Sequence, residues 1–211
     1  MKALLVYSGG MDSTVMLHQY QKNIVLAINF QYGSKHNFSE LNCARENCYK
    51  LGIPLMIQEL EFGLFKSDLL KTGGEIPKGD YEADNMSKTI VPFRNGIMLS
   101  FAAGIAESNN CDTILIANHF GDHAIYPDCR AEFIKPMIKA IKNGTTNRVI
   151  LSAPYTRHTK RQIALIGNRK EVDFAKTYSC YVGGAVHCGE CATCVERKEA
   201  LKGFDNTDYL T

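Results

Sequence analysis

The sequence lacks any long apolar run and any large excess of charge. No stretch of it approaches the roughly 18 apolar residues that indicate a membrane-spanning helix. Its 24 lysines and arginines against 22 acidic residues leave a net charge of +2. Binding along an extended nucleic acid depends on a larger basic surplus that neutralises phosphates. We therefore expect no membrane segment and no stable nucleic-acid partner.

A secretory signal and a disulfide framework are also missing. Lys2 is followed at once by the apolar residues 3–7, which leaves no room for a signal peptide. Four of the eight cysteines lie between Cys180 and Cys194, unlike the spread pattern of a short secreted scaffold. We therefore expect a cytoplasmic protein in which clustered cysteines bind a metal.

What is present is an alternation of apolar strands and helical patterns. Near-continuous apolar runs at residues 3–7, 24–30, 53–57, 112–117 and 148–154 predict five buried strands. Helical patterns lie between them, which favours an α/β fold, a doubly wound parallel five-stranded sheet. Residues 1–176 are expected to form this domain, and residues 177–211 a C-terminal segment packed on it. Ligands of such sheets bind at the carboxyl ends of the strands.

Three local predictions go with this pattern. Residues 61–91 have no periodicity, and we interpret them as a flap over the site or as a disordered insertion. Pro136 predicts that the helix carrying Ile134 begins only at about Phe133. Thr159 is a plausible N-cap for the helix that follows the fifth strand.

A glycine-rich turn follows the first strand, with the sequence Ser8-Gly9-Gly10-Met11-Asp12-Ser13-Thr14. Ser13 and Thr14 stand where an N-cap is expected, before a helix at Val15. Backbone N–H groups and the helix dipole meet at such a turn and favour phosphate. The turn lacks the lysine of a Walker A loop and the third glycine of a dinucleotide fingerprint. Its other interpretation is a tight turn without a ligand.

The four clustered cysteines predict a metal site. Cys188, Cys191 and Cys194 form overlapping C-x-x-C pairs, and Cys180 lies eight residues upstream across Gly183 and Gly184. Four thiolates suit tetrahedral zinc in a structural role. An iron–sulfur cluster is the rival interpretation, His187 could replace one ligand, and a redox pair or unrelated buried thiols remain weaker alternatives.

Polar residues gather after the fourth strand and at two helix starts. The segment 118–130 contains two acids, two histidines, a thiol and an arginine directly past the end of a strand. Arg94 and Lys160 stand at helix starts, where a cation could reach phosphate at the same rim. For both cations, an exposed surface position is the alternative.

Several segments together resemble known families. The glycine-rich turn resembles the pyrophosphate loop of the PP-loop ATP pyrophosphatases. With Tyr126-Pro127-Asp128-Cys129-Arg130-Ala131-Glu132-Phe133 and the cysteine tail, the chain closely resembles the QueC family from its first strand to its last cysteine. Residues 31–36 and 91–95 are also similar to their family counterparts.

The QueC resemblance implies an adenine-nucleotide alpha-hydrolase-like fold and an ATP-dependent ligase that forms carbon–nitrogen bonds. Its substrates would be 7-carboxy-7-deazaguanine and ammonia, and its product 7-cyano-7-deazaguanine, in queuosine-type nucleoside biosynthesis. The carboxylate would be adenylated, converted to an amide, and activated again to give the nitrile. The family resemblance also suggests a homodimer.

The resemblance assigns roles to residues that match the motifs. ATP would contact Ser8, Gly9, Gly10, Met11, Asp12, Ser13, Thr14 and Arg94. The deazaguanine would contact Tyr126, Asp128, Cys129 and Arg130. Asp12, Arg94, Asp128, Arg130 and Lys160 form the predicted catalytic set, with Mg²⁺ near Asp12. Structural zinc would bind Cys180, Cys188, Cys191 and Cys194. For Asp128 and Arg130, a mutual pair within a capped loop is the alternative.

Three rival functions stay open at this point. A PP-loop relative could adenylate a tRNA base for thiolation, with Cys129 as the persulfide carrier. Another could attach the deazaguanine to a macromolecule. A non-enzymatic zinc-knuckle RNA-binding module would need basic and aromatic residues around its cysteines, whereas residues 181–186 carry no charge.

Overall fold

Five parallel strands form the centre of the molecule. The computed structural model describes residues 1–210 of the chain. The strands are β1 (Ala3–Val6), β2 (Ile24–Gln31), β3 (Leu55–Glu59), β4 (Thr113–Leu115) and β5 (Ile150–Ser152), in the order β3-β2-β1-β4-β5. All four pairings are parallel, as predicted. The order reverses between β1 and β4, which is where such sheets open a crevice for a ligand.

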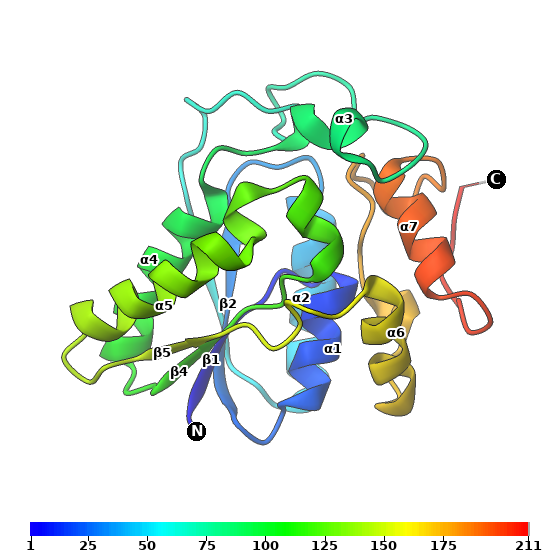
Figure 1. The fold of residues 1–211 in the computed structure, drawn as a ribbon. Helices are drawn as coiled ribbons and strands as arrows, with labels where there is room; N and C mark the ends of the chain where they lie inside the picture. Colours follow the sequence, from blue (N-terminus) through cyan, green and yellow to red (C-terminus); the bar gives the residue numbers. More distant parts are fainter. Residues whose placement is uncertain (211) are drawn as a thin grey trace.

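Helices cover both faces of the sheet (Figure 1). On one face lie α1 (Met11–Gln19), α2 (Asn37–Leu51) and α6 (Lys160–Arg169), and on the other α4 (Arg94–Ser108) and α5 (Ala131–Gly144). Successive side chains of a strand point to opposite faces. Leu5 and Tyr7 therefore pack in the α1 and α6 core, and Leu4 packs in the α4 and α5 core.

The segment between β3 and α4 lies beyond the carboxyl ends of the strands (Figure 1). It is largely irregular, apart from α3 (Ala83–Met86) and a 3-10 turn at Ser87–Thr89. Lys78 forms a β-bridge with Cys191, and its Nζ lies 2.6 Å from Glu190 Oε2. The segment is thus tied to the C-terminal segment, whose helix α7 (Ala192–Ala200) packs beside α6.

Helix starts differ from the predictions. Helix α1 begins at Met11 with Gly10 as its N-cap, so the predicted cap at Ser13 and Thr14 was wrong. Both hydroxyls instead donate to the Gly10 carbonyl, at 3.2 and 2.8 Å, from inside the first turn.

Helix α5 begins at Ala131, two residues before the predicted start. The N–H of Ile134 donates to Arg130 O at 2.9 Å, so helical hydrogen bonding is established ahead of Pro136. Strand β3 is shifted two residues toward the C-terminus, whereas the Thr159 N-cap is confirmed by a capping box with Gln162.

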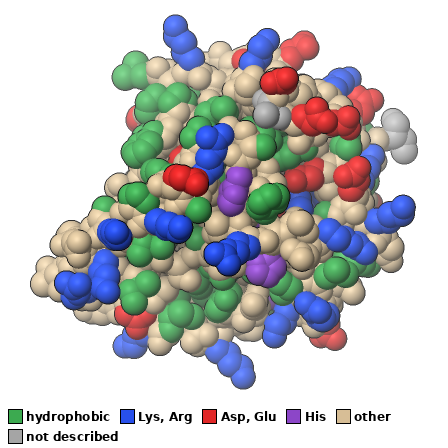
Figure 2. Space-filling model, viewed as in Figure 1, with side chains coloured by type: hydrophobic (Ala, Val, Ile, Leu, Met, Phe, Trp, Pro, Cys, Tyr) green, Lys and Arg blue, Asp and Glu red, His purple; other side chains and the backbone are tan. Residues whose placement is uncertain are grey.

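Within residues 1–210, no helix combines the length and the apolarity needed to cross a membrane. Figure 2 shows charge of both signs on one face, with acidic side chains gathered over α3 and α7 and basic ones over α5. The exposed members include Glu82, Asp84 and Glu190 on one side and Lys135 and Lys139 on the other.

Candidate active site

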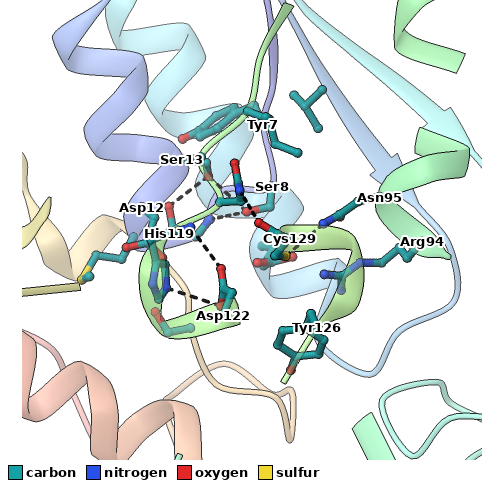
Figure 3. Close-up of a pocket in the computed structure, with 18 of the residues that line it drawn as sticks. Tyr7, Ser8, Asp12, Ser13, Arg94, Asn95, His119, Asp122, Tyr126 and Cys129 are labelled. Atoms are coloured by element: carbon teal, nitrogen blue, oxygen red, sulfur yellow. Dashed lines mark hydrogen bonds and ion pairs between the residues drawn. The ribbon is translucent and has the colours of Figure 1, made fainter. Parts of the chain in front are cut away.

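A cavity of about 220 Å³ opens where the sheet order reverses. Figure 3 shows Asp12, His119 and Asp122 on one side of it, with Arg94 and Tyr126 on the other. The wall combines the glycine-rich turn, two helix starts, the 118–130 segment, the irregular segment and the cysteine tail. Its polar members include Ser8, Asp12, Ser13, Tyr32, His36, Glu40, Tyr81, Arg94, Asn95, Asn118, His119, Asp122, Tyr126, Lys160, Ser179, Tyr181 and Thr193.

The glycine-rich turn is shaped by its contact with α2. Gly9 has φ +97°, and a Cβ on it would lie 2.1 Å from Glu40 O and 2.9 Å from Ala44 N. Only glycine permits both this conformation and this close approach. Gly10 N donates to Ser8 Oγ at 2.9 Å, and Ser8 Oγ lies 3.1 Å from Ser13 Oγ. The N-terminus of α1, with these hydroxyls, provides the surroundings that phosphate favours.

Lys160 lies between two acidic side chains at the cavity rim. Its Nζ is 3.2 Å from Asp12 Oδ2 and 3.0 Å from Glu196 Oε2. Burial lowers the pKa of Lys160, but the carboxylates of Asp12 and Glu196 outweigh it and raise the pKa above its ordinary value. Lys160 is therefore charged at neutral pH and available to an anion in the cavity.

His119 joins this polar side of the cavity. Its Nε2 lies 3.5 Å from Asp122 Oδ1 and 3.8 Å from Asp12 Oδ2, and its Nδ1 accepts from Gly121 N at 3.0 Å. The ring is 1% exposed. The imidazole is thus held between the carboxylates of Asp12 and Asp122 at the cavity wall.

Arg94 faces the opposite side of the cavity. It begins α4, and its Nη1 donates to Tyr32 Oη at 3.1 Å. The preceding Phe93 has φ +52° and carries the chain into the helix. The next residue, Asn95, donates its N–H to Asp128 Oδ2 at 2.8 Å, so the Asp128 carboxylate satisfies a free amide of the first turn of α4.

The structure brings most of the predicted site residues to the cavity. Its lining includes Ser8, Gly10, Met11, Asp12, Ser13, Arg94, Tyr126, Cys129 and Lys160. Gly9 and Thr14 support the turn from beneath, and Thr14 Oγ1 lies 3.1 Å from Tyr7 Oη.

Asp128 and Arg130 do not line this cavity. Arg130 Nε donates to His123 O at 2.6 Å, and Asp128 is occupied with Asn95. Among the ion pairs of residues 1–210, none joins Asp128 to Arg130. The mutual pair considered from the sequence is therefore absent there.

Sequence reasoning missed several residues of the wall. His36 stacks on Tyr181 with ring centroids 5.0 Å apart, and Glu40 lies one helical turn after His36. The rule that ligands bind past the carboxyl ends of strands does place residues 31–36 at the same rim as residues 8–13, although it gives His36 no role. Glu40, Tyr181 and Glu196 had no such signal, because they reach the cavity only through the packing of α2 and the C-terminal segment.

The four predicted cysteines form one compact cluster. Their Sγ atoms all lie within 4.8 Å of one another, and the Cys191–Cys180 and Cys188–Cys194 Sγ distances are 3.9 and 4.0 Å. Tetrahedral zinc with bonds of about 2.3 Å would separate two sulfurs by about 3.8 Å. The fit to one four-coordinate ion is close.

His187 is committed elsewhere, because its Nε2 accepts from Ser179 N at 3.0 Å. The alternative in which His187 replaces a cysteine ligand is therefore wrong for this arrangement. The same tail brings Ser179, Tyr181 and Thr193 to the cavity. Arg197, 0% exposed, donates to Phe174 O and Ser179 Oγ and anchors this tail on the sheet domain.

Known proteins of one family are similar to this chain over nearly its whole length. A family model described as queuosine biosynthesis protein QueC matches residues 2–205. A 7-cyano-7-deazaguanine synthase of Porphyromonas gingivalis is 57% identical over 98% of this chain and 96% of its own length. Relatives of the same name from Desulfotalea psychrophila and Methanoregula boonei are 49% and 42% identical, over 99% and 100% of this chain.

A solved structure supports the fold assignment. NMN synthetase from Francisella tularensis aligns with a TM-score of 0.52 at 12% identity, over 89% of this chain and 70% of that one. At this identity the likeness concerns the arrangement of strands and helices alone.

Proposed function

The chain belongs to the QueC family, and we infer that it is a 7-cyano-7-deazaguanine synthase, an ATP-dependent ligase. It converts 7-carboxy-7-deazaguanine and ammonia to 7-cyano-7-deazaguanine, a step toward queuosine-type nucleosides. The observation that carries this conclusion is the full-length similarity to synthases of that name. The cavity beside the glycine-rich turn supports it, since it offers phosphate-binding groups at one end and aromatic residues at the other.

The reaction explains why such a cavity is needed. A carboxylate accepts a nucleophile poorly until its oxygen carries a good leaving group. Attack of that oxygen on the α-phosphorus of ATP would release pyrophosphate and leave an acyl adenylate. Ammonia would then displace AMP to give the amide. The amide oxygen would attack the α-phosphorus of a second ATP and release a second pyrophosphate, and loss of AMP and the nitrogen-bound protons would leave the nitrile. Fixed donors stabilise the charge that develops on the phosphate and carbonyl oxygens.

ATP is proposed to lie with its phosphates against the glycine-rich turn, between Lys160 and Arg94. Both cations face the cavity from opposite sides, so they could divide the phosphate charge. Mg²⁺ is proposed to bind near Asp12. Asp12 Oδ1 is buried and accepts no hydrogen bond from residues 1–210, which leaves a hard oxygen for that ion.

The deazaguanine is proposed to lie near Tyr126 and Cys129, which both line the cavity. Contacts of Asp128 and Arg130 with this substrate stay predictions. Each side chain already has a backbone partner, through Asp128 Oδ2 and Arg130 Nε, and neither lines the cavity.

The cysteine cluster is proposed to hold one structural zinc ion. Four thiolates fill a tetrahedral coordination shell, so no position would remain for substrate. An iron–sulfur cubane, with its several metal atoms, would need its cysteine sulfurs further apart than 4.0 Å. We also propose a cytoplasmic homodimer without a stable nucleic-acid partner, and a 1–176 domain carrying a 177–211 segment.

The tRNA-thiolation alternative is weakened by the state of Cys129. Its side chain is 3% exposed, and its Sγ lies 3.2 Å from Asn95 Nδ2. Burial raises the pKa of Cys129 well above its ordinary value. A persulfide carrier depends on an accessible thiolate, which this thiol does not supply.

Pyrophosphate release from ATP tests the proposed function. We expect release with 7-carboxy-7-deazaguanine and ammonium together, and formation of the nitrile by mass spectrometry. Replacing the acid by RNA should give no release. Asp12→Asn should abolish turnover, whereas the exposed Asp84→Asn should leave it intact. Absence of release from the wild type with both substrates, at full zinc content, would reject the assignment.

A further inference from the structure

A buried carboxyl group lies directly against the glycine-rich turn. Glu40 is on α2, and its side chain is 14% exposed. Its Oε1 is 3.2 Å from the point where a Cβ on Gly10 would lie, in the same cleft of the turn as Ser8 Oγ. Its Oε2 is 3.5 Å from His36 Nε2. Glu40 therefore lines the cavity where the phosphates are proposed to bind.

Among the ion pairs of residues 1–210, Glu40 takes part in one, with His36, and in none with a lysine or arginine. Burial raises the pKa of Glu40 to about 8, although Arg94 and the Ser8 hydroxyl oppose the shift. Burial and Arg94 together lower the pKa of its neighbour His36 to about 3, so that imidazole is neutral.

Two further titratable groups near Glu40 are neutral and so do not favour its ionised form. Burial raises the pKa of Cys43, one turn further along α2, to about 11. It also raises the pKa of Tyr7, the residue directly after β1, far above its ordinary value. Both are neutral at pH 7. The charged groups Asp12, Asp122 and Lys160 face the same cavity.

An ionised carboxylate at this place would repel a bound pyrophosphate group, because like charges in a buried site interact strongly. A neutral carboxylic acid would instead offer an O–H donor. At helix N-termini, backbone N–H groups donate hydrogen bonds to phosphate oxygens. The O–H of a neutral carboxylic acid could donate to such an oxygen in the same way.

We propose that Glu40 contacts the bound nucleotide as a neutral carboxylic acid and donates its O–H to a phosphate oxygen held by the glycine-rich turn. This inference rests on the proposed binding of ATP there. It makes Glu40 a nucleotide-binding residue that works only while protonated.

Two substitutions separate this role from that of an ionised carboxylate. Glu40→Gln retains a donor of similar shape that does not titrate, and Glu40→Leu removes the donor. The control is Glu46→Gln on the same helix, since Glu46 is exposed and pairs with Lys176. The rate of pyrophosphate release is measured as kcat/KM for ATP between pH 6 and 10. Circular dichroism melting and zinc content check each variant for folding.

For the wild type we expect kcat/KM for ATP to fall above about pH 8, as the free enzyme loses the Glu40 proton. Glu40→Gln should stay within about threefold of the wild type at pH 7. Its ratio to the wild type should rise about tenfold between pH 7 and pH 9, because only the wild type titrates. Glu40→Leu should raise KM for ATP at least about tenfold at pH 7. This difference from the wild type should shrink toward pH 9, because the wild type has by then lost the same donor.

Three results would overturn the proposal. First, kcat/KM for ATP at pH 7 could be lowered as much in Glu40→Gln as in Glu40→Leu. This would mean that an ionised carboxylate is required, as a base for ammonium or a Mg²⁺ ligand. A constant Gln-to-wild-type ratio across the pH range would exclude titration of Glu40. A normal KM for ATP in Glu40→Leu would exclude the contact.

Failure of the proposed function gives a different result. If the wild type binds ATP but releases no pyrophosphate with the acid and ammonium, the substrate assignment fails and the Glu40 inference stands untouched. The dissociation constant of ATP is then measured by calorimetry for the wild type and both Glu40 variants at the same pH values. The variants should differ from the wild type by the same factors as expected for kcat/KM and KM.

Discussion

Lys160 on α6 and Glu196 on α7 form an ion pair of 3.0 Å that connects the cavity rim to the cysteine-bearing segment. Glu196 lies two residues after the cluster cysteine Cys194. The side chain that faces the proposed phosphates is thus held in place from the C-terminal segment. This link couples the proposed zinc site to the proposed ATP site without a shared residue.

Loss of the Lys160 charge should impair ATP use. We expect Lys160→Met to lower kcat/KM for ATP by about 100-fold or more, since one charge-stabilising group in a buried site has effects of this size. The matched control is Lys135→Met, because Lys135 is exposed on α5. Steady-state pyrophosphate release measures both. Equal activity of the two variants would contradict a phosphate-binding role for Lys160.

Removal of the metal should affect the cavity as well as stability. Ser179, Tyr181 and Thr193 line it, and they lie among the cluster cysteines. We expect Cys188→Ser to lose bound zinc, measured by atomic emission, to lower Tm, and to lose turnover. Cys43→Ser, outside the cluster, should keep its zinc. Full turnover in a zinc-free protein would show that the knuckle does not shape the site.

Gly9 and Gly33 both have positive φ, but only Gly9 lies against another element. Alanine substitutions at the two positions therefore distinguish the cost of backbone strain from the cost of a steric clash. Gly9 has φ +97°, and a Cβ there meets backbone atoms of α2, whereas Gly33 has φ +81° and open space around it. Gly33→Ala should cost about 1 kcal/mol of unfolding free energy from strain alone. Gly9→Ala should cost more than about 2 kcal/mol and abolish ATP turnover, because α2 has to move. Chemical denaturation and activity assays measure both, and equal costs would contradict the close approach.

Arg94 and Arg130 provide a test of where the substrates bind. Arg94 lines the cavity, and Arg130 is bound to the carbonyl of His123. We expect Arg94→Gln to lower kcat/KM for ATP by at least about tenfold. Arg130→Gln should leave KM for ATP unchanged. Arg130→Gln could raise KM for the deazaguanine acid without changing KM for ATP. That result would support the predicted contact of Arg130 with the substrate carboxylate.

Strand positions, and the motifs that lie next to the strands in the chain, could be predicted from local residue patterns. Apolar runs gave five strands to within a few residues, because buried parallel strands need such runs regardless of their neighbours. The glycine-rich turn and the four cysteines could be found for the same reason, since their chemistry depends on residues close in sequence.

Tertiary structure alone decided which distant side chains meet at the cavity. Glu40 and Glu196 were not found from the sequence, because helix packing across more than 25 intervening residues brings them beside the glycine-rich turn and Lys160. Asp128 was assigned to a ligand, yet its carboxylate satisfies the first turn of α4. A free helix amide and a bound substrate both need a hydrogen-bond acceptor, so the sequence could not show that one oxygen of this carboxylate is held by the Asn95 N–H.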